Sequence, residues 1–237
     1  MRVLVTGVAG FVGPWVAAAF VEAGHEVHGL VRGAGPWPRL APLRLALHRG
    51  SLGDDAFPAL IADVVPDAIV HLAGLSFVPE AERDPSAAYR ANLDGTIAVL
   101  AAVRARAPRA RVLVVTSGDV YGAVQPGELP VAEETPLRPL TVYGASKAAA
   151  DLAAAQWGRA YGLDVVRARP FNHTGPGQAP VFVCSALARQ LALIESGGQE
   201  PVVRVGNPDP VRDFSDVRDI AAGYLALAER GRTGEVY

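Results

Sequence analysis

The first 31 residues place a glycine-rich turn between a strand-forming run and a helix-forming run. Residues 2–6 are mostly apolar and include β-branched side chains, and residues 26–31 form a second run of this kind. Between them, residues 14–23 have a helical pattern that begins with Pro14, a residue favoured in a first helical turn. Gly24 follows the helical run, where a left-handed cap residue is favoured. This order of elements predicts a β-α-β unit with parallel strands.

The same alternation continues along the chain. Further strand-like runs separated by longer helical patterns lie at residues 43–48, 68–72, 111–116 and 164–169. Short apolar runs separated by helices are typical of a parallel sheet that is buried on both faces. We therefore expect an α/β fold, a Rossmann-like doubly wound parallel sheet.

A change of texture after residue 168 suggests two domains. We expect an NAD(P)-binding Rossmann domain at residues 1–168 and a smaller substrate lobe at residues 169–237. The second part combines loops rich in proline and glycine with helical patterns at residues 181–196 and 216–230. No clean linker separates the two parts, so we expect them to be partly interleaved. Because residues 234–237 resemble the start of another strand, we expect the lobe to be incomplete.

The composition excludes several other classes of protein. Half of the 237 residues are hydrophobic and only 19% are charged, which excludes a disordered chain. The formal net charge of −2 offers no basic excess for nucleic acid or an anionic membrane, and we expect neither as a partner. Residues 3–21 resemble a signal peptide only weakly, because three glycines and Pro14 interrupt them. A single cysteine, Cys184, excludes an intrachain disulfide framework and a multi-cysteine zinc site, so we expect a cytoplasmic protein without a metal.

The glycines of the first turn predict a dinucleotide site. Gly7, Gly10 and Gly13 follow a strand and open a helix, with Phe11 and Val12 between the last two. Glycine allows a tight turn and a close approach of the backbone to a pyrophosphate, whose charge suits the helix N-terminus. The spacing is G-x-x-G-x-x-G, which differs from the G-x-G-x-x-G of most dehydrogenases.

The end of the second strand-like run bears on the choice of cofactor. Arg32 stands where a carboxylate would bind the adenosine ribose of NAD, and no carboxylate lies nearby in the sequence. A guanidinium group pairs well with a 2′-phosphate. We therefore expect NADP to be preferred, with NAD as the alternative.

A tyrosine and a lysine at helical spacing are candidates for proton transfer. Tyr143 and Lys147 lie four residues apart in an alanine-rich helical run, so their side chains share a face. Ser117 follows the strand-like run at 111–116, at the edge where open parallel sheets bind ligands. A nearby ammonium group and an oxidised nicotinamide would lower the pKa of Tyr143 by stabilising its phenolate. This pattern predicts that Tyr143 acts as an acid or a base.

Together these motifs resemble the extended short-chain dehydrogenases/reductases of the NAD-dependent epimerase/dehydratase family, over nearly the whole chain. The motifs that carry the resemblance are the glycine turn, residues 71–74 (HLAG) and 92–96 (NLDGT), Ser117 with residues 120–122 (VYG), and the pair Tyr143 and Lys147. The resemblance implies that Ser117 orients the reacting oxygen and that Tyr143 exchanges its proton. It also implies that Lys147 holds the nicotinamide ribose and tunes Tyr143.

The resemblance also implies further contacts with the cofactor. The residues implied are Ser51, Leu52, Leu72, Ala73, Gly74, Thr116 and Pro170. Ser51 stands where the family often has aspartate, so this sequence departs from the family pattern beside the adenine.

The second lobe resembles the members of the family that reduce GDP-linked 4-keto-6-deoxymannose. Residues 168–178, 203–207 and 212–219 carry this similarity. It implies that Asn172 and Arg212 contact the diphosphate and ribose of the nucleotide, a role for which arginine has the right geometry. The other substrate-binding candidates are Ser76, Asp119 and Arg204.

These resemblances imply NAD(P)H-dependent reduction of a nucleotide-linked 4-keto-6-deoxyhexose, with a GDP-linked sugar as the substrate. The alternatives are a nucleotide-sugar 4-epimerase and a GDP-mannose 4,6-dehydratase, although Asp119 is shorter than the glutamate expected of the dehydratase. A non-catalytic dinucleotide-binding protein is disfavoured because Tyr143 and Lys147 are both present. Residues 85–107 and 142–161 resemble dimer-forming helices of the family, so we expect a homodimer.

Overall fold

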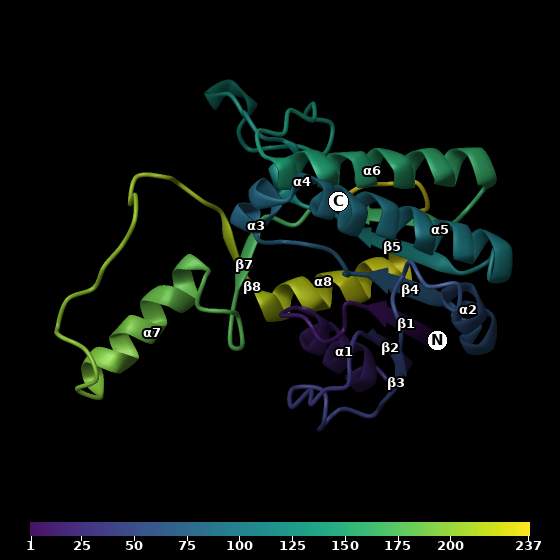
Figure 1. The fold of residues 1–237 in the computed structure, drawn as a ribbon. Helices are drawn as coiled ribbons and strands as arrows, with labels where there is room; N and C mark the ends of the chain where they lie inside the picture. Colours follow the sequence, from purple (N-terminus) through teal and green to yellow (C-terminus); the bar gives the residue numbers. More distant parts are fainter.

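A computed structural model describes all residues from 1 to 237, and a parallel sheet lies at its centre (Figure 1). The six strands run in the spatial order β3-β2-β1-β4-β5-β6. Their bounds are Leu45–Arg49 (β3), Glu26–Val31 (β2), Arg2–Thr6 (β1), Ala68–His71 (β4), Arg111–Val115 (β5) and Val165–Ala168 (β6). Every pairing between neighbours is parallel. This is the strand order of a Rossmann fold, so the predicted α/β class is confirmed.

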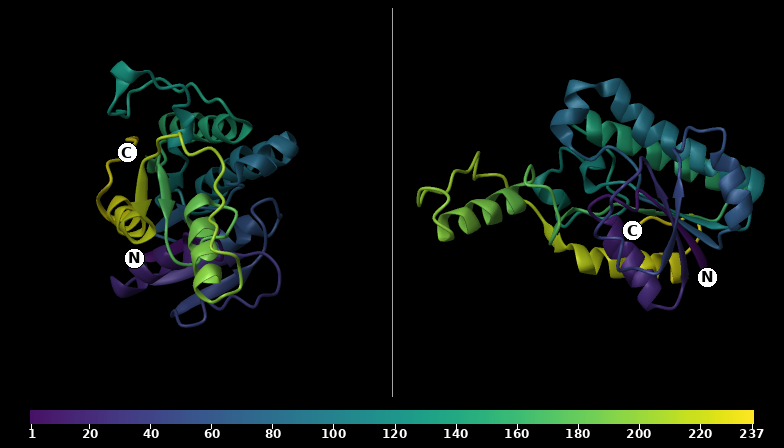
Figure 2. Two further views of the ribbon diagram at one scale, coloured as in Figure 1. Left: turned by 90° about the vertical axis from the view of Figure 1, so that its left-hand side faces the viewer. Right: turned by 60° about the horizontal axis from the view of Figure 1, so that its bottom comes forward.

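Helices cover both faces of the sheet (Figures 1 and 2). One layer consists of α1 (Gly13–Glu22) and α8 (Val217–Arg230), and the other of α2 (Phe57–Val64), α5 (Gly95–Arg106) and α6 (Val142–Tyr161). Two separate hydrophobic cores result. In β1, Val3 and Val5 belong to the core under α1 and α8, whereas Leu4 belongs to the core under α2 and α5. Alternate side chains of one strand therefore fill both cores, as the near-continuous apolar runs predicted.

The helical region predicted at residues 85–107 is interrupted. It comprises α4 (Pro85–Tyr89), a π-helical turn (Arg90–Asp94) and α5, and a short α3 (Val78–Arg83) precedes it. The π-helical turn directs Asn92 into the protein, where its side-chain amide bonds both main-chain groups of Leu75 and the hydroxyl of Ser146. An inserted residue in a helix often marks a functional region.

Three of the predicted strands extend one residue too far at their carboxyl ends. The runs predicted to end at residues 72, 116 and 169 leave the regular strands after residues 71, 115 and 168. At these points the chain turns to form the edge of the sheet that carries the functional cleft.

The segment after β6 projects beyond the carboxyl edge of the sheet (Figures 1 and 2). It contains β7 (Asn172–Thr174), α7 (Val183–Glu195) and β8 (Phe214–Asp216), and β7 and β8 form a second, parallel two-stranded sheet. The chain then returns through α8, which packs beside α1 on the main sheet. The division into domains at residues 168 and 169 stays a prediction.

The last residues extend the main sheet. Val236 forms a parallel bridge with Arg167 of β6, and the Tyr237 amide donates a hydrogen bond of 3.0 Å to the Arg167 carbonyl oxygen. The main-chain amide of Arg169 in turn donates to the carbonyl oxygen of Tyr237 at 2.8 Å. Residues 235–237 therefore pair with β6 at the edge of the main sheet. None of the helices has the length and apolarity needed to span a membrane.

Candidate active site

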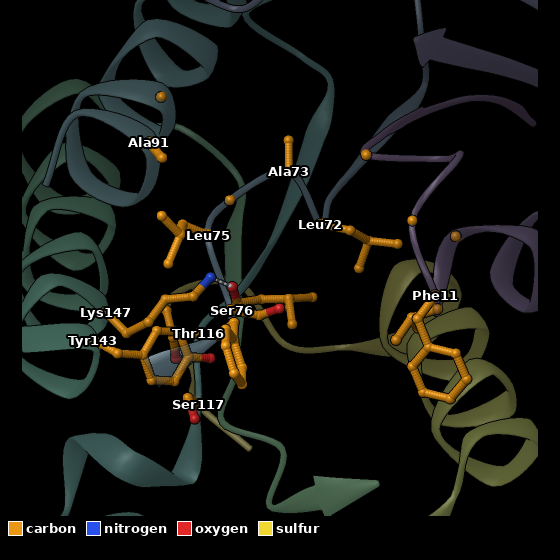
Figure 3. A pocket seen from close by; sticks show the side chains of 18 of the residues that line it. Phe11, Leu72, Ala73, Leu75, Ser76, Ala91, Thr116, Ser117, Tyr143 and Lys147 are labelled. Atoms are coloured by element: carbon orange, nitrogen blue, oxygen red, sulfur yellow. Dashed lines mark hydrogen bonds between the residues drawn. The ribbon is translucent and has the colours of Figure 1, made fainter. Parts of the chain in front are cut away.

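A cleft of about 1410 Å³ lies at the carboxyl edge of the main sheet, and residues of the projecting segment line part of it (Figure 3). The structure brings every predicted catalytic and cofactor-binding residue to its wall: Gly7, Gly10, Phe11, Val12, Gly13, Arg32, Ser51, Leu52, Leu72, Ala73, Gly74, Thr116, Ser117, Tyr143, Lys147 and Pro170. Four predicted substrate residues also line the cleft: Ser76, Asp119, Asn172 and Arg212. Figure 3 shows Tyr143, Lys147 and Ser117 on one side of the cleft and Phe11 on the opposite side.

Two of the three turn glycines are required by the protein's own packing. Gly7 has a φ of +72°, and a Cβ atom on it would lie 2.7 Å from the Ala73 nitrogen. A Cβ atom on Gly13 would lie 2.3 Å from the carbonyl oxygen of Val8. At Gly10 the nearest atom would be the Gly7 oxygen at 3.2 Å, so the protein alone restricts this position less. A glycine at this position also keeps the cleft side of the turn open for a ligand to approach the backbone.

The start of α1 suits a negatively charged ligand. No side chain caps this end of the helix, and its first turn has no acidic residue. Its first amide groups are therefore not bonded by a cap and carry the positive end of the helix dipole. Together with the turn glycines, this arrangement fits the pyrophosphate of a dinucleotide.

The part of the cleft beside β2 and β3 contains the residues predicted to bind the adenosine of the cofactor. It also contains one acidic residue that sequence reasoning missed. Arg32 lies just after β2, and Ser51 and Leu52 lie after β3. Asp94, the last residue of the π-helical turn, also lines the cleft. The next residue, Gly95, lies close to Leu52, because a Cβ atom on Gly95 would be 3.3 Å from the Leu52 side chain. Asp94 belongs to the motif at 92–96, so its position in that motif was the signal that could have identified it.

Helix α6 presents Tyr143 and Lys147 to the cleft. The Thr141 side chain caps the helix by accepting a hydrogen bond of 2.9 Å from the Gly144 amide. The Lys147 ammonium is buried and donates a hydrogen bond of 3.0 Å to the Val115 carbonyl oxygen. Burial lowers the pKa of Lys147 to about 8, because the charged form loses hydration.

Burial has the largest effect on the pKa of Tyr143 in this structure. Burial raises its pKa to about 12, and the negative charge of Asp119 acts in the same direction, while the Ser117 side chain opposes the shift. Tyr143 therefore keeps its phenol proton to a higher pH than an exposed tyrosine does. The sequence argument concerned Tyr143 beside Lys147 and a bound oxidised nicotinamide, and the lowered pKa in that complex stays a prediction.

Ser117 and Asp119 occupy a tight turn directly after β5. The Ser117 hydroxyl oxygen accepts a hydrogen bond of 3.2 Å from the Asp119 amide, which opens the 3₁₀ turn Gly118–Val120. Burial raises the pKa of the Asp119 carboxyl, and the charge of Arg212 opposes this shift. Asp119 and Arg212 both line the cleft, although they come from separate segments of the chain.

Two aromatic pairs line the cleft, and sequence reasoning did not predict either pair. Phe11 of the glycine turn stacks on His173 of β7, with ring centroids 6.2 Å apart and planes at 8°. Phe77, after β4, meets Phe182 edge-on at 5.8 Å. Tyr224 of α8 also lines the cleft. The sequence of α8 has an amphipathic pattern, which predicts a buried face but does not identify a residue of the cleft.

Arg204 is the one predicted substrate residue that the structure does not bring to the cleft. It lies in the projecting segment, where its main-chain nitrogen and oxygen pair with the Gln190 side chain at 2.8 Å and 3.0 Å. The sequence motif at 203–207 did not indicate that Arg204 lies away from the cleft. The path of a long loop depends on contacts that a local sequence pattern does not encode. Its role in substrate binding stays a prediction.

Comparison with known proteins agrees with this architecture. Residues 3–237 match the model of the NAD dependent epimerase/dehydratase family. The chain is 43% identical to a GDP-6-deoxy-D-mannose reductase of Pseudomonas aeruginosa, over 100% of this chain and 73% of that protein.

Two solved structures are also similar. The structure of RMD from Pseudomonas aeruginosa complexed with NADPH has a TM-score of 0.84 and 40% identity, covering 100% of this chain and 75% of that chain. The complex of the Thermus thermophilus UDP-glucose 4-epimerase with NAD has a TM-score of 0.87 and 29% identity, covering 100% of this chain and 76% of that chain. Because the family model matches residues 3–237 and a reductase of the family is 43% identical over the whole chain, this chain belongs to the NAD-dependent epimerase/dehydratase family.

Proposed function

We propose that this chain catalyses the NADPH-dependent reduction of the 4-keto group of a nucleotide-linked 4-keto-6-deoxyhexose, converting GDP-4-keto-6-deoxymannose to GDP-rhamnose. The observation that carries the proposal is the similarity to a GDP-6-deoxy-D-mannose reductase along the whole chain, at 43% identity. The cleft supports it chemically, because the buried Tyr143 holds its proton as a reduction requires.

In this proposal three side chains divide the proton chemistry. When bound, NADPH supplies the hydride for the keto carbon. Tyr143 donates its phenol proton to the keto oxygen, and Ser117 orients that oxygen by hydrogen bonding. Lys147 binds the ribose of the cofactor and, as an ammonium group, stabilises the phenolate that Tyr143 becomes.

We propose NADPH as the preferred cofactor because Arg32 follows β2 and lines the cleft. A guanidinium group pairs with the 2′-phosphate that distinguishes NADPH from NADH. Similar structures contain NADPH in one case and NAD in another, so both cofactors occur in the family.

For the substrate we propose contacts with Asn172 and Arg212 at the nucleotide and with Ser76 and Asp119 nearer the sugar. All four residues line the cleft. Arg212 is suited to a diphosphate, because its charge and planar donor groups match phosphate oxygens.

Two other functions have specific observations in their favour. The similarity to a UDP-glucose 4-epimerase with NAD favours an epimerase. The partly buried Asp119 carboxyl favours a GDP-mannose 4,6-dehydratase, because its raised pKa suits proton transfer. An epimerase regenerates its cofactor in each cycle, so stoichiometric NAD released from the purified, denatured protein would favour the epimerase over the reductase.

We also propose a homodimer in the cytoplasm. The exposed apolar side chains of Leu152 and Tyr161 on α6 are available for a helix-helix interface, and a single cysteine suits a reducing compartment. Light scattering coupled to gel filtration tests the dimer.

The deciding experiment follows nicotinamide absorbance with GDP-4-keto-6-deoxymannose as the substrate. We expect the protein to consume NADPH faster than NADH and to form GDP-rhamnose, and we expect Tyr143→Phe to abolish this activity while still binding NADPH. Folded protein that binds NADPH but consumes neither cofactor would refute the reductase.

A further inference from the structure

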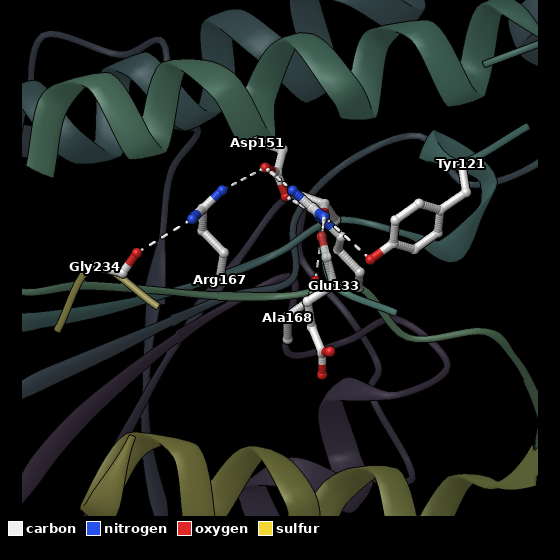
Figure 4. Close-up of polar contacts among 8 residues, drawn as sticks. Tyr121, Glu133, Asp151, Arg167, Ala168 and Gly234 are labelled. Atoms are coloured by element: carbon white, nitrogen blue, oxygen red, sulfur yellow. Dashed lines mark hydrogen bonds and ion pairs between the residues drawn. The ribbon is translucent and has the colours of Figure 1, made fainter. Parts of the chain in front are cut away.

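A buried carboxylate lies behind the active site, on the same helix as Tyr143 and Lys147. Asp151 follows Lys147 by one helical turn, and its side chain is fully buried. It accepts hydrogen bonds from Arg169 at 2.8 Å and 2.9 Å, from Arg167 at 2.8 Å and from the Thr116 hydroxyl at 3.2 Å (Figure 4). Three hydrogen bonds from two guanidinium groups therefore converge on the two oxygen atoms. The Thr116 hydroxyl has a single proton for two acceptors, Asp151 and the Ala168 carbonyl oxygen at 3.1 Å.

The residues bonded to Asp151 lie beside the active-site residues. Thr116 directly precedes Ser117, and Arg169 directly precedes Pro170. Arg169 also donates hydrogen bonds to the Tyr121 hydroxyl at 3.1 Å and to the Glu133 carbonyl oxygen at 2.9 Å. Asp151 thus connects α6 with the carboxyl ends of β5 and β6 and with the turn that follows Ser117.

The charges of this cluster favour a single arrangement of its side chains. Two guanidinium groups face one carboxylate, and the positive charge of both arginines holds the pKa of Asp151 below its usual range despite burial. The two-pronged contact of Arg169 with Asp151 restricts both distance and angle, as paired hydrogen bonds between these groups do. Removing the carboxylate would leave two guanidinium groups without their counter-charge.

We propose that Asp151 is a positioning residue of the active site, whose bonds with Arg167, Arg169 and Thr116 set the placement of α6 relative to Ser117. The kinetic part of this inference rests on the proposed reductase function, because it assumes that Tyr143 and Ser117 act on one oxygen atom. Displacements of about 1 Å at such a site can reduce rates by about 100-fold.

Asp151→Asn tests the proposal, since it keeps the shape of the side chain and removes its charge. Asp164→Asn is the matched control, because Asp164 pairs with Arg111 at 3.0 Å at the opposite end of β6. Hydrogen exchange measured by mass spectrometry gives a readout that needs no substrate. We expect faster exchange in residues 116–122 and 142–148 of Asp151→Asn but not of Asp164→Asn, and unchanged exchange there would overturn the proposal.

Kinetics with NADPH and GDP-4-keto-6-deoxymannose provide the second readout. We expect Asp151→Asn to lower kcat by about 10- to 100-fold, with the KM for NADPH changed by less than about threefold. We also expect a larger isotope effect from NADPH deuterated at the transferred position, because hydride transfer becomes slower relative to product release. A smaller folded fraction lowers kcat without changing the isotope effect. An unchanged isotope effect in Asp151→Asn would therefore refute the positioning role. An equal decrease of kcat in Asp164→Asn would also refute it.

Two more variants keep the test decisive if Asp151→Asn does not fold. Tyr121→Phe removes a single hydrogen bond to Arg169 and should give a smaller change in the same direction for both readouts. Asp151→Glu keeps the negative charge. Its hydrogen exchange in residues 116–122 and 142–148 should therefore be closer to that of the original protein than the exchange of Asp151→Asn is. If the original protein shows no reductase activity, the proposed function fails, and hydrogen exchange alone decides whether Asp151 positions the site.

Discussion

The Lys147 ammonium donates a hydrogen bond of 3.0 Å to the carbonyl oxygen of Val115, so the lysine is tethered to the strand that leads into Ser117. The same ammonium nitrogen lies 3.5 Å from where a Cβ atom on Gly74 would be. Lys147 therefore occupies the base of the cleft, between the loops that follow β4 and β5.

Replacing this lysine should separate activity from stability. We expect Lys147→Met to lower kcat for the reduction by at least about 100-fold, because a positioned ionic group is removed. We expect the free energy of unfolding at pH 7 to be higher, because a buried charge is replaced by an apolar chain. Steady-state kinetics and urea unfolding at pH 7 test this, and a kcat within about threefold of the original would contradict it.

Lys147 also predicts how stability depends on pH. Its pKa falls from 10.5 to about 8 on folding, so between these values the unfolded chain binds more protons than the folded one. The free energy of unfolding should therefore rise with pH from about 8, by up to about 1.4 kcal/mol per pH unit. Tyr143 acts in the opposite direction above pH 10, because its pKa rises from 10.0 to about 12 on folding.

The measurement compares urea unfolding at pH 7.5 and 9.5 in the original protein and in Lys147→Met. The difference between the two proteins should shrink at the higher pH. An equal pH dependence in both would show that Lys147 does not titrate in this range.

His71 should make the protein sensitive to acid. It is fully buried, bonded to the Thr6 hydroxyl at 2.8 Å and to the Thr96 hydroxyl at 3.1 Å, and burial lowers its pKa to about 3. Because the unfolded chain binds the proton first, this contribution to stability is present above pH 6.5 and is lost as the pH falls toward 3. We expect His71→Asn to lose less stability than the original protein between pH 7 and pH 5, as measured by urea unfolding, and the opposite order would contradict the assignment.

Two glycine-to-alanine substitutions should have opposite effects. Gly13→Ala places a methyl group 2.3 Å from the Val8 oxygen, so α1 must move away from the glycine turn. We expect a lower melting temperature and weaker NADPH binding. Gly223 is the matched control inside α8, where a Cβ atom has no neighbour within 4 Å. There alanine should stabilise the helix by about 1 kcal/mol, so equal effects of the two substitutions on the melting temperature would contradict the packing argument.

Arg32 should determine the choice between the two nicotinamide cofactors. We expect Arg32→Ala to raise the KM for NADPH by about 10-fold or more and to leave the KM for NADH within about twofold, because one charge-assisted contact with the 2′-phosphate is lost. Initial rates with each cofactor test this. Parallel changes with both cofactors would assign Arg32 to a feature that NADPH and NADH share.

Much of the fold and part of the site could be predicted from local patterns. The glycines between a strand and a helix, and the alternation of short apolar runs with helices, predicted the Rossmann sheet. The spacing of Tyr143 and Lys147 predicted a shared helical face. Each of these signals depends on residues within one or two elements of each other, where turn chemistry and periodicity act directly.

The remaining features depend on segments that are far apart in the sequence. The bonds of Asp151 with Arg167 and Arg169, the stacking of Phe11 on His173, and the absence of Arg204 from the cleft all follow from how the elements pack. No local pattern encodes these partners.

The sequence by itself thus determined the class of fold, and it predicted the kind of cofactor site and the residues that exchange a proton. Only the tertiary structure decided the direction in which the pKa of Tyr143 shifts, because burial and the charge of Asp119 both raise it. A pKa depends on solvent exclusion and on every nearby charge. Those quantities exist only once distant parts of the chain have packed together.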